Sequence, residues 1–488
     1  MTTLPFRLAF AVGLVTVPVV THAADPPPPL IIFEDVNLFD GKSDEIKKGM
    51  HVAVAGKLIH SVSEKKVAVP NGVRPKVINC RGKPWVLMPG LIDAHVHATS
   101  GMGPLDLLTA DYTYVALRGA GELEMMLDRG FTSVRDMGGN TFGLKRAIDE
   151  GRLRGPRIFP SGAIISQTSG HGDYRLVTDR PRRFGGPLGR GEQLGMALVA
   201  DGKDEVLVAA REQLRLGASQ IKLAVGGGVV SSFDPVEVNE YSEEEIRAAV
   251  SAANNWGTYV AVHVYTKEGC AKAMCAGVRC LEHATLIDKA TVKKIAALPP
   301  EKAVFLSLQV LAFRLPFTDD PAMIRRNKQV ADNIPNVIDW ARSHKVKVCF
   351  GTDLLLDPRP MAAQSAELTA RVKEGFTAIE VLRQATGVNG ELLALSGKRN
   401  SYDDTQPIKI GVVEAGAFAD LLLVDEDPIK DIARLVDWDP EANEYHGRQL
   451  VDKKAWDPAK SVRPPGVEFG SHLLVIMKDG KFHKERIP

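Results

Sequence analysis

The stretch LIDAHVH, from Leu91 to His97, is an apolar run that carries two histidines at its end. Seven similar short runs follow it: TSVRD (132–136), RIFPSGAII (157–165), QIKLAV (220–225), TYVAVHV (258–264), VRCLEH (278–283), VFLSLQV (304–310) and KVCFG (347–351). Such near-continuous apolar runs are typical of strands buried on both faces of a parallel sheet. Because most gaps between the runs have helical spacing, the pattern predicts an α/β fold with a (β/α)8 TIM-type barrel. An open doubly wound sheet is the alternative.

Two gaps between these runs have distinctive features. In the gap before TYVAVHV, Ser242 and Glu245 form a capping box, which predicts the start of a helix. The gap at 166–200 is long for a barrel connection and rich in Gly, Pro and Arg, which favours a functional loop.

Outside the predicted barrel, both ends of the chain have short alternating segments that favour strands. They lie at 30–59, 419–428 and 472–482. We therefore expect both ends to build one small β-sandwich-like domain. The predicted organisation is a signal peptide (1–23), a first β part (24–87), the barrel (88–407) and a second β part (408–488) with a polar insertion around 437–471.

The first residues have the pattern of a cleaved secretory signal. Arg7 precedes an apolar stretch from Leu8 to Val20, and Thr21 and Ala23 stand where a signal peptidase reads small residues. The stretch is shorter than the roughly 20 residues of a membrane span, although a retained anchor is the alternative reading. We expect an exported protein, periplasmic or secreted, that makes no membrane contact after signal removal.

The composition limits the class of protein. Lys and Arg number 61 against 60 Asp and Glu, a net charge of +1, which argues against a nucleic-acid partner. A hydrophobic content of 44% is ordinary for a packed globular chain. Five scattered cysteines do not form a disulfide framework, so we expect buried free thiols.

Polar groups that can bind metal recur where the predicted strands end. His95 and His97 are two residues apart, so on a strand both imidazoles face the same side. The ends of later runs carry further groups of this kind: Lys222, His263, His283 and Asp353. A barrel places its active site at the C-terminal strand ends, so these six side chains predict one site.

Taken together, the motifs of the sequence resemble those of the amidohydrolase superfamily. MPGLIDAHVH (88–97) is similar to its signature, and the resemblance continues through VRDMGG, KLAVGGG, AVHVY, CLEHAT and FGTD to the segment 411–432. Within that superfamily the chain looks most like the imidazolonepropionase-like branch of Xaa-Pro dipeptidases, zinc carboxypeptidases and ochratoxinase. The segment SGAIISQTSGHGD (161–173) is the part most similar to ochratoxinase and the prolidase-like enzymes.

This resemblance implies a binuclear zinc site. His95, His97 and Asp353 would hold one zinc, His263 and His283 would hold the other, and an N6-carboxylated Lys222 and a hydroxide would bridge the two. The glycines at 226–228 leave room for close approach to that lysine. Asp353 would also act as general base and then acid. Asp93 would orient a first-strand histidine, or alternatively cap a turn.

Two further residues are candidate catalytic groups. His171, in the long loop, is either a substrate-facing hydrogen-bond donor or a surface histidine. Tyr265 lies two residues after His263 and so faces the same side of its strand. Relatives such as ochratoxinase have a histidine there, so Tyr265 is a departure. It either donates to a developing oxyanion or packs in the wall.

The function that follows is zinc-dependent hydrolysis of an amide, with release of a C-terminal amino acid from dipeptides or N-acyl amino acids, ochratoxin A included. The alternatives are a cyclic-amide, imidazolone-type or lactone hydrolase on the same binuclear site, a mononuclear deaminase, and a non-catalytic extracytoplasmic binding protein. We expect a small-molecule substrate as partner, together with self-association into a homo-oligomer.

Overall fold

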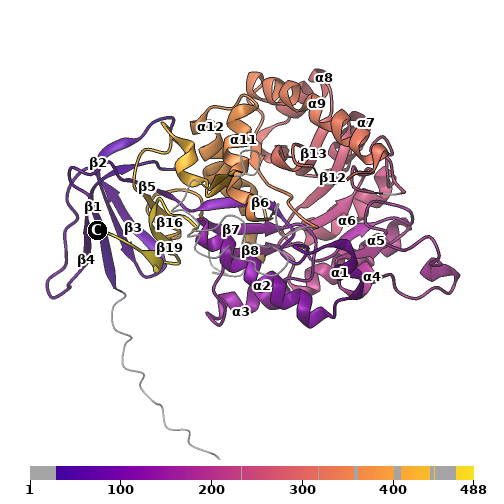
Figure 1. Cartoon of the computed structure of the whole chain (residues 1–488), viewed down its shortest axis with the longest axis horizontal. Coiled ribbons are helices and arrows are strands. Elements are labelled where there is room, and N and C mark those ends of the chain that lie inside the picture. The colour runs from indigo at the N-terminus through magenta and orange to yellow at the C-terminus, as the bar shows by residue number, and fades with distance from the viewer. Residues whose placement is uncertain are drawn as a thin grey trace, which may run out of the picture.

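A computed structural model describes residues 29–231, 233–316, 318–356, 361–400, 408–439, 444–445 and 469–488 (Figure 1). The predicted signal peptide and most of the predicted polar insertion lie outside these residues. None of the described helices is long and apolar enough to cross a membrane.

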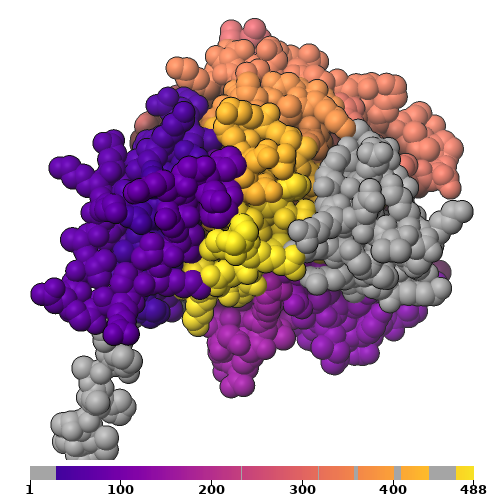
Figure 2. Space-filling view, turned by 60° about the vertical axis from the view of Figure 1, so that its left-hand side comes forward, coloured from indigo at the N-terminus to yellow at the C-terminus, as the bar shows by residue number. Residues whose placement is uncertain are grey.

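Strands from both ends of the chain share one sheet. Among the described residues it has eight strands: β1 (Leu30–Leu38), β2 (Lys47–Ala55), β3 (Leu58–Ser63), β4 (Lys76–Asn79), β5 (Val86–Pro89), β16 (Leu421–Val424), β19 (Leu473–Lys478) and β20 (Lys481–Glu485). The two ends meet where β5 pairs with β1 on one side and with β16 on the other. Figure 2 shows the C-terminal segment in yellow against the indigo N-terminal segment. A two-stranded ribbon, β17 (Trp438–Asp439) and β18 (Glu444–Tyr445), is separate.

The middle of the chain forms parallel strands. One sheet holds β6 (Leu91–Val96), β7 (Phe131–Asp136) and β8 (Arg157–Pro160). The other holds β9 (Ile164–Ser166), β10 (Ala197–Val199), β11 (Ile221–Ala224), β12 (Val260–Thr266), β13 (Cys280–Leu286), β14 (Phe305–Leu308) and β15 (Val348–Phe350). Each of the eight predicted runs contains a strand. The third run was predicted as one strand but is divided into β8 and β9, because the chain turns at Gly162, where φ is 70°.

Helices connect the parallel strands and cover their outer side (Figure 1). They are α1 (Pro104–Thr109), α2 (Tyr112–Asp128), α3 (Phe142–Asp149), α4 (Arg190–Gln193), α5 (Gly202–Leu216), α6 (Glu243–Asn255), α7 (Lys267–Ala276), α8 (Lys289–Ala296), α9 (Pro321–Ser343), α11 (Glu367–Lys373), α12 (Ala378–Arg383) and α13 (Asn389–Ala394). The capping box of Ser242 and Glu245 is present at the start of α6, so that prediction is confirmed. The long 166–200 connection contains α4 and β10.

The two parallel sheets come together at their first and last strands. The Asn389 side chain donates to the carbonyl of Ile92 on β6 (2.7 Å) and to that of Phe350 on β15 (2.8 Å). One apolar cluster collects side chains from several parallel strands: Ala94, Met137, Tyr259, Ala261, Cys280, Phe305 and Cys349. The arrangement is consistent with a TIM-type barrel.

The cysteines are free thiols, and four of them are buried as expected. The expectation is wrong for Cys275, which is exposed. It lies on α7, whose buried positions include Cys270 and Ala273. Burial on a helix follows the 3.6-residue period, so Cys275 falls outside the packed stripe.

Candidate active site

The two histidines of the first parallel strand meet the aspartate that follows the last one. His95 lies on β6, His97 directly after it, and Asp353 shortly after β15. Oδ1 of Asp353 is 3.4 Å from Nε2 of His95 and 3.2 Å from Nε2 of His97. Potential ligand atoms of all three residues lie within 4.8 Å of one another, close enough to share one metal ion. Asp353 has a left-handed backbone (φ 52°), and its N–H donates to the His95 carbonyl at 2.8 Å.

Two more histidines extend this cluster, so that four imidazoles lie next to one another in a series, called the histidine ring below. His283, on β13, has its ring centroid 5.3 Å from that of His95. His263, on β12, has its ring centroid 4.6 Å from that of His283. The side chains come from three strands, yet they gather at one end of the parallel sheets. The structure therefore brings together the candidate histidines, which lie in separate runs of the sequence.

Each of these four imidazoles has one ring nitrogen held by a protein oxygen. Nδ1 of His95 is 2.8 Å from Oε2 of Glu282, and Nδ1 of His283 is 2.7 Å from Oε1 of Gln309. Nδ1 of His97 is 3.1 Å from a carbonyl oxygen, and Nε2 of His263 is 2.9 Å from another. An oxygen acceptor holds the N–H of a neutral imidazole, which leaves the other nitrogen as a lone-pair donor.

The chemistry of this donor set fits a metal centre. Burial lowers the pKa of His95 to about 4 and that of His283 to about 3, and it lowers the pKa of His263 well below its usual value. These rings are therefore neutral at pH 7, which is the form that binds metal. Among the described residues, the buried Oδ1 of Asp353 has no well-directed hydrogen bond. An anionic oxygen that faces two imidazole nitrogens without a well-directed hydrogen bond is a position that a divalent cation would satisfy.

The pKa values of His97 and Asp353 shift in opposite directions, because the two groups stabilise each other's charge. Burial opposes charge on His97, but the adjacent Asp353 outweighs it and raises the pKa of His97. Burial also opposes ionisation of Asp353, yet the surrounding histidines hold the pKa of that carboxyl below its usual value. Asp353 is therefore ionised at neutral pH and able to accept a proton.

Lys222 extends from β11 into the same region and is 2% exposed. Burial lowers its pKa, and the charges of Glu282 and Asp353 oppose that change. No carboxylate among the described residues lies within ion-pair distance of its amine. A buried amine without a direct counter-charge is favoured in its neutral form.

His171 reaches the site from the long loop after β9. Its ring stacks on that of His263, with centroids 3.9 Å apart, and Oδ2 of Asp234 is 3.0 Å from its Nδ1. Its backbone N–H donates to the buried carboxyl of Glu240 at 2.9 Å. The structure thus places His171 against a candidate metal ligand, although the ring remains partly accessible.

The glycine run after β11 makes room for this contact. A Cβ on Gly228 would lie 2.2 Å from two atoms of the His171 ring. The carbonyl of Gly227 is the acceptor for His263. These glycines therefore allow the close approach of His171 and supply an acceptor to His263, and their expected role beside Lys222 stays a prediction.

Tyr265 follows His263 on β12 and is buried. Its ring stacks on His283 at 5.0 Å between centroids and meets Phe313 edge-on at 6.2 Å. Burial raises the pKa of its phenol well above the usual value, so it stays protonated and can donate a hydrogen bond. Tyr265 can therefore pack in the wall of the site and also donate a hydrogen bond.

Within the described part of the chain, Asp93 accepts hydrogen bonds from backbone and side-chain groups but not from an imidazole. Oδ1 accepts the N–H of His95 at 3.0 Å and that of Thr352 at 3.1 Å. Oδ2 accepts the Thr352 hydroxyl at 2.6 Å and the Gln364 amide at 2.9 Å. Burial raises the pKa of Asp93 to about 6. Of the two roles considered for Asp93, these contacts match the capping role.

Five residues around the site were not singled out from the sequence: Glu282, Gln309, Arg135, Asp234 and Glu240. A charged residue inside a buried apolar run, as in VRCLEH, is the signal that could have found Glu282. Asp234 and Glu240 lie in a loop between β11 and α6, where no periodic pattern marks them.

Comparison with known proteins agrees with this geometry. The Amidohydrolase family model matches residues 86–447, which is most of the chain. The chain belongs to the amidohydrolase family. It is 30% identical over 410 residues to an ochratoxinase of Aspergillus niger, a match that covers 78% of this chain and 76% of the relative.

Two solved structures are similar over nearly the whole chain. A prolidase crystallised with N-methylphosphonate-L-proline is 31% identical, with a TM-score of 0.76 and coverage of 93% of this chain and 100% of that one. An Xaa-Pro dipeptidase with bound methionine in its active site is 25% identical, with a TM-score of 0.72 and coverage of 93% and 100%. This amidohydrolase is thus a hydrolase of the prolidase and ochratoxinase-like branch.

Proposed function

We propose that this amidohydrolase is zinc-dependent and releases a C-terminal amino acid from dipeptides or N-acyl amino acids. The observation that carries the proposal is the series of four neighbouring histidines, each with one nitrogen held by a protein oxygen, beside the carboxylate of Asp353. The similarity to an ochratoxinase, a prolidase and an Xaa-Pro dipeptidase supports an amide substrate with an amino acid as leaving group. Ochratoxin A is accordingly among the candidate substrates.

We assign the proposed ligands to two zinc ions. His95, His97 and Asp353 form one ligand set, and His263 and His283 form the second. Lys222 is the proposed bridge, because burial lowers the pKa of its amine, and the unprotonated amine can add to CO2, lose a proton and become an anionic carbamate. Zinc accepts imidazole and carboxylate ligands in such sets. When bound, two zinc ions would supply a hydroxide nucleophile at neutral pH and polarise the scissile carbonyl.

The protein's own groups perform the remaining steps. The ionised Asp353 takes the proton of the nucleophile and passes it to the leaving amine, as general base and then general acid. His171, held through Nδ1 by Asp234, is the proposed donor to the scissile carbonyl or the substrate carboxylate. Donation from Nε2 requires the imidazolium form of the ring, because Asp234 already takes the Nδ1 proton. Tyr265, kept protonated by burial, is a second donor for the developing oxyanion.

The test is release of a free amino acid by the zinc-loaded protein beginning at Ala24, from a panel of dipeptides, N-acyl amino acids and ochratoxin A. We expect release of the C-terminal amino acid from at least one member of the panel. Zinc analysis of the same sample is expected to give about two zinc ions per chain. A protein that binds both zinc ions yet releases nothing would contradict the amino-acid specificity and favour cyclic amides or lactones.

Export, domain boundaries and self-association stay predictions from the sequence. N-terminal sequencing of the mature protein would check cleavage after Ala23, and size-exclusion chromatography with light scattering would give the number of chains per particle.

A further inference from the structure

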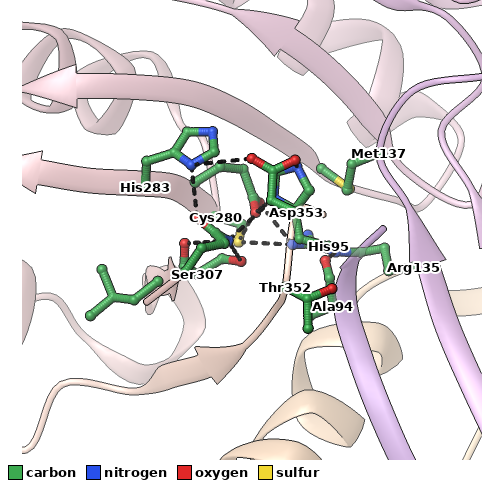
Figure 3. A network of polar contacts seen from close by, with 12 residues as sticks. Ala94, His95, Arg135, Met137, Cys280, His283, Ser307, Thr352 and Asp353 are labelled. Atoms are coloured by element: carbon green, nitrogen blue, oxygen red, sulfur yellow. Dashed lines mark hydrogen bonds and ion pairs between the residues drawn. The ribbon is translucent and has the colours of Figure 1, made fainter. Parts of the chain in front are cut away.

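A buried ion pair touches His95, one of the predicted ligands, and belongs to the network of polar contacts drawn in Figure 3. Nη2 of Arg135, on β7, donates to Oε1 of Glu282 at 2.8 Å, and both side chains are 0% exposed. Oε2 of the same carboxylate is 2.8 Å from Nδ1 of His95. Glu282 therefore connects a permanent cation on one side with the imidazole on the other.

Further contacts fix the orientation of Arg135. Its Nε donates to the carbonyl of Ala94 at 2.5 Å, and Nη1 donates to the hydroxyl of Tyr259 at 3.3 Å. The thiol of Cys280 donates to Oε1 of Glu282 at 3.0 Å. Oε1 thus faces two donors, which leaves Oε2 for His95.

An irregularity in β13 allows Glu282 to occupy this position. In a regular strand, Glu282 and His283 would point to opposite faces. Here His283 and Ala284 have positive φ angles of 68° and 46°, and the pairing with β12 shifts register just after His283. Such a bulge re-aims one side chain. Both residues consequently face the interior, where Glu282 contacts His95 and His283 joins the ring.

From this geometry we infer that Glu282, oriented by Arg135, is a positioning residue that prepares His95 to bind metal. The carboxylate can only accept, so it selects the tautomer of His95 with its proton on Nδ1. The lone pair on Nε2 then points toward Oδ1 of Asp353. The inference rests on the proposed function, because the ligand that Nε2 awaits is the zinc of the His95, His97 and Asp353 set.

The variant Glu282→Gln tests this role with almost no change in volume. Arg135 is always a donor, so the glutamine oxygen should turn toward it and the amide NH2 should face His95. That NH2 would donate to Nδ1 and force the proton onto Nε2, the tautomer that cannot bind zinc through Nε2. We expect zinc affinity to fall about 10- to 100-fold at one of the two sites, the usual effect of losing such a supporting group.

The measurement is a zinc titration of the metal-free full chain against a chromophoric chelator. Asp420→Asn is the matched control, because Asp420 also forms a buried ion pair (2.9 Å, with Arg157) but does not touch the site. We expect it to lower stability and leave both zinc affinities unchanged. A folded Glu282→Gln protein with wild-type affinity at both sites would overturn the inference.

A second pair of variants separates positioning from structural support, and it also carries the test if Glu282→Gln does not fold. With Arg135→Met added, the glutamine oxygen is free to turn to Nδ1 of His95, so affinity should recover. The double variant with Arg135→Met and Glu282→Met offers no acceptor to Nδ1 of His95. Its zinc affinity should therefore stay about 10- to 100-fold below that of the wild type. Equal affinities in these two double variants would refute the role of Glu282. A wild-type chain that binds no zinc would instead refute the proposed function itself.

Discussion

Replacing Glu240 with glutamine should stabilise the protein at alkaline pH and change little near pH 4. Glu240 is 0% exposed, and its carboxyl accepts the N–H of His171. Burial raises its pKa from 4.5 to about 8, with the nearby Asp234 adding to the effect. A glutamine oxygen can accept the same N–H without ever becoming charged.

The magnitude follows from proton linkage. Between pH 4.5 and about 8 the folded protein keeps a proton on Glu240 that the unfolded chain has lost. The free energy of unfolding therefore falls by about 1.4 kcal/mol for each pH unit in that window. Below it both states are protonated, and above it both are ionised. The variant does not lose stability in this way. The difference in free energy of unfolding, variant minus wild type, should therefore be roughly 3 to 5 kcal/mol larger at pH 8.5 than at pH 4.5.

Urea unfolding of both proteins at pH 4.5, 6.5 and 8.5, with chelator in every sample, measures this difference. Titration of the histidines is common to both proteins and cancels in the comparison. Glu244→Gln is the control, because it makes the same exchange on a side chain that is 74% exposed and so removes a carboxyl that is not buried. If the difference in free energy of unfolding between wild type and Glu240→Gln is constant across the pH range, the buried carboxyl does not hold its proton and the reasoning is wrong.

Three further outcomes are expected. Asp353→Asn should keep zinc, since an amide oxygen can still ligate, but lose about 10²- to 10⁴-fold in turnover, checked by amino-acid release and metal analysis. Asp234→Asn should weaken the acceptor of His171 and lower kcat/KM by about 10-fold without changing zinc content, checked by steady-state kinetics. Ser242→Ala should remove the cap of α6 and lower the free energy of unfolding by about 1 kcal/mol, checked by urea unfolding, with kcat/KM unchanged.

Regular strands were the part of the fold that the sequence could predict well. Buried parallel strands produce apolar runs, and each of the eight predicted runs contains one. Alternation also correctly placed His95 beside His97, since both have Nε2 within 3.4 Å of Asp353. The same rule placed Tyr265 beside His263, with ring centroids 5.1 Å apart.

Contacts made by loops could not be predicted in this way. His171 meets Asp234 across 63 positions of sequence, and its backbone meets Glu240 across 69. These distances depend on how two connections fold over the same strand ends, and no residue pattern encodes that. The left-handed turn at Gly162 likewise divides a run whose residues are otherwise suited to one strand.

The bulge in β13 shows why the supporting groups of a site are harder to predict than its ligands. Alternation applied to VRCLEH assigns Glu282 and His283 to opposite faces, so one of them would have to lie outside the parallel sheets. A buried carboxylate on that apolar side would be costly without a partner. The conflict disappears only if the backbone leaves the regular strand, and the positive φ angles at His283 and Ala284 show that it does. Backbone strain of this kind, held by the surrounding structure, is concentrated at functional sites, and here it lets one strand supply both a ligand and the group that prepares another ligand.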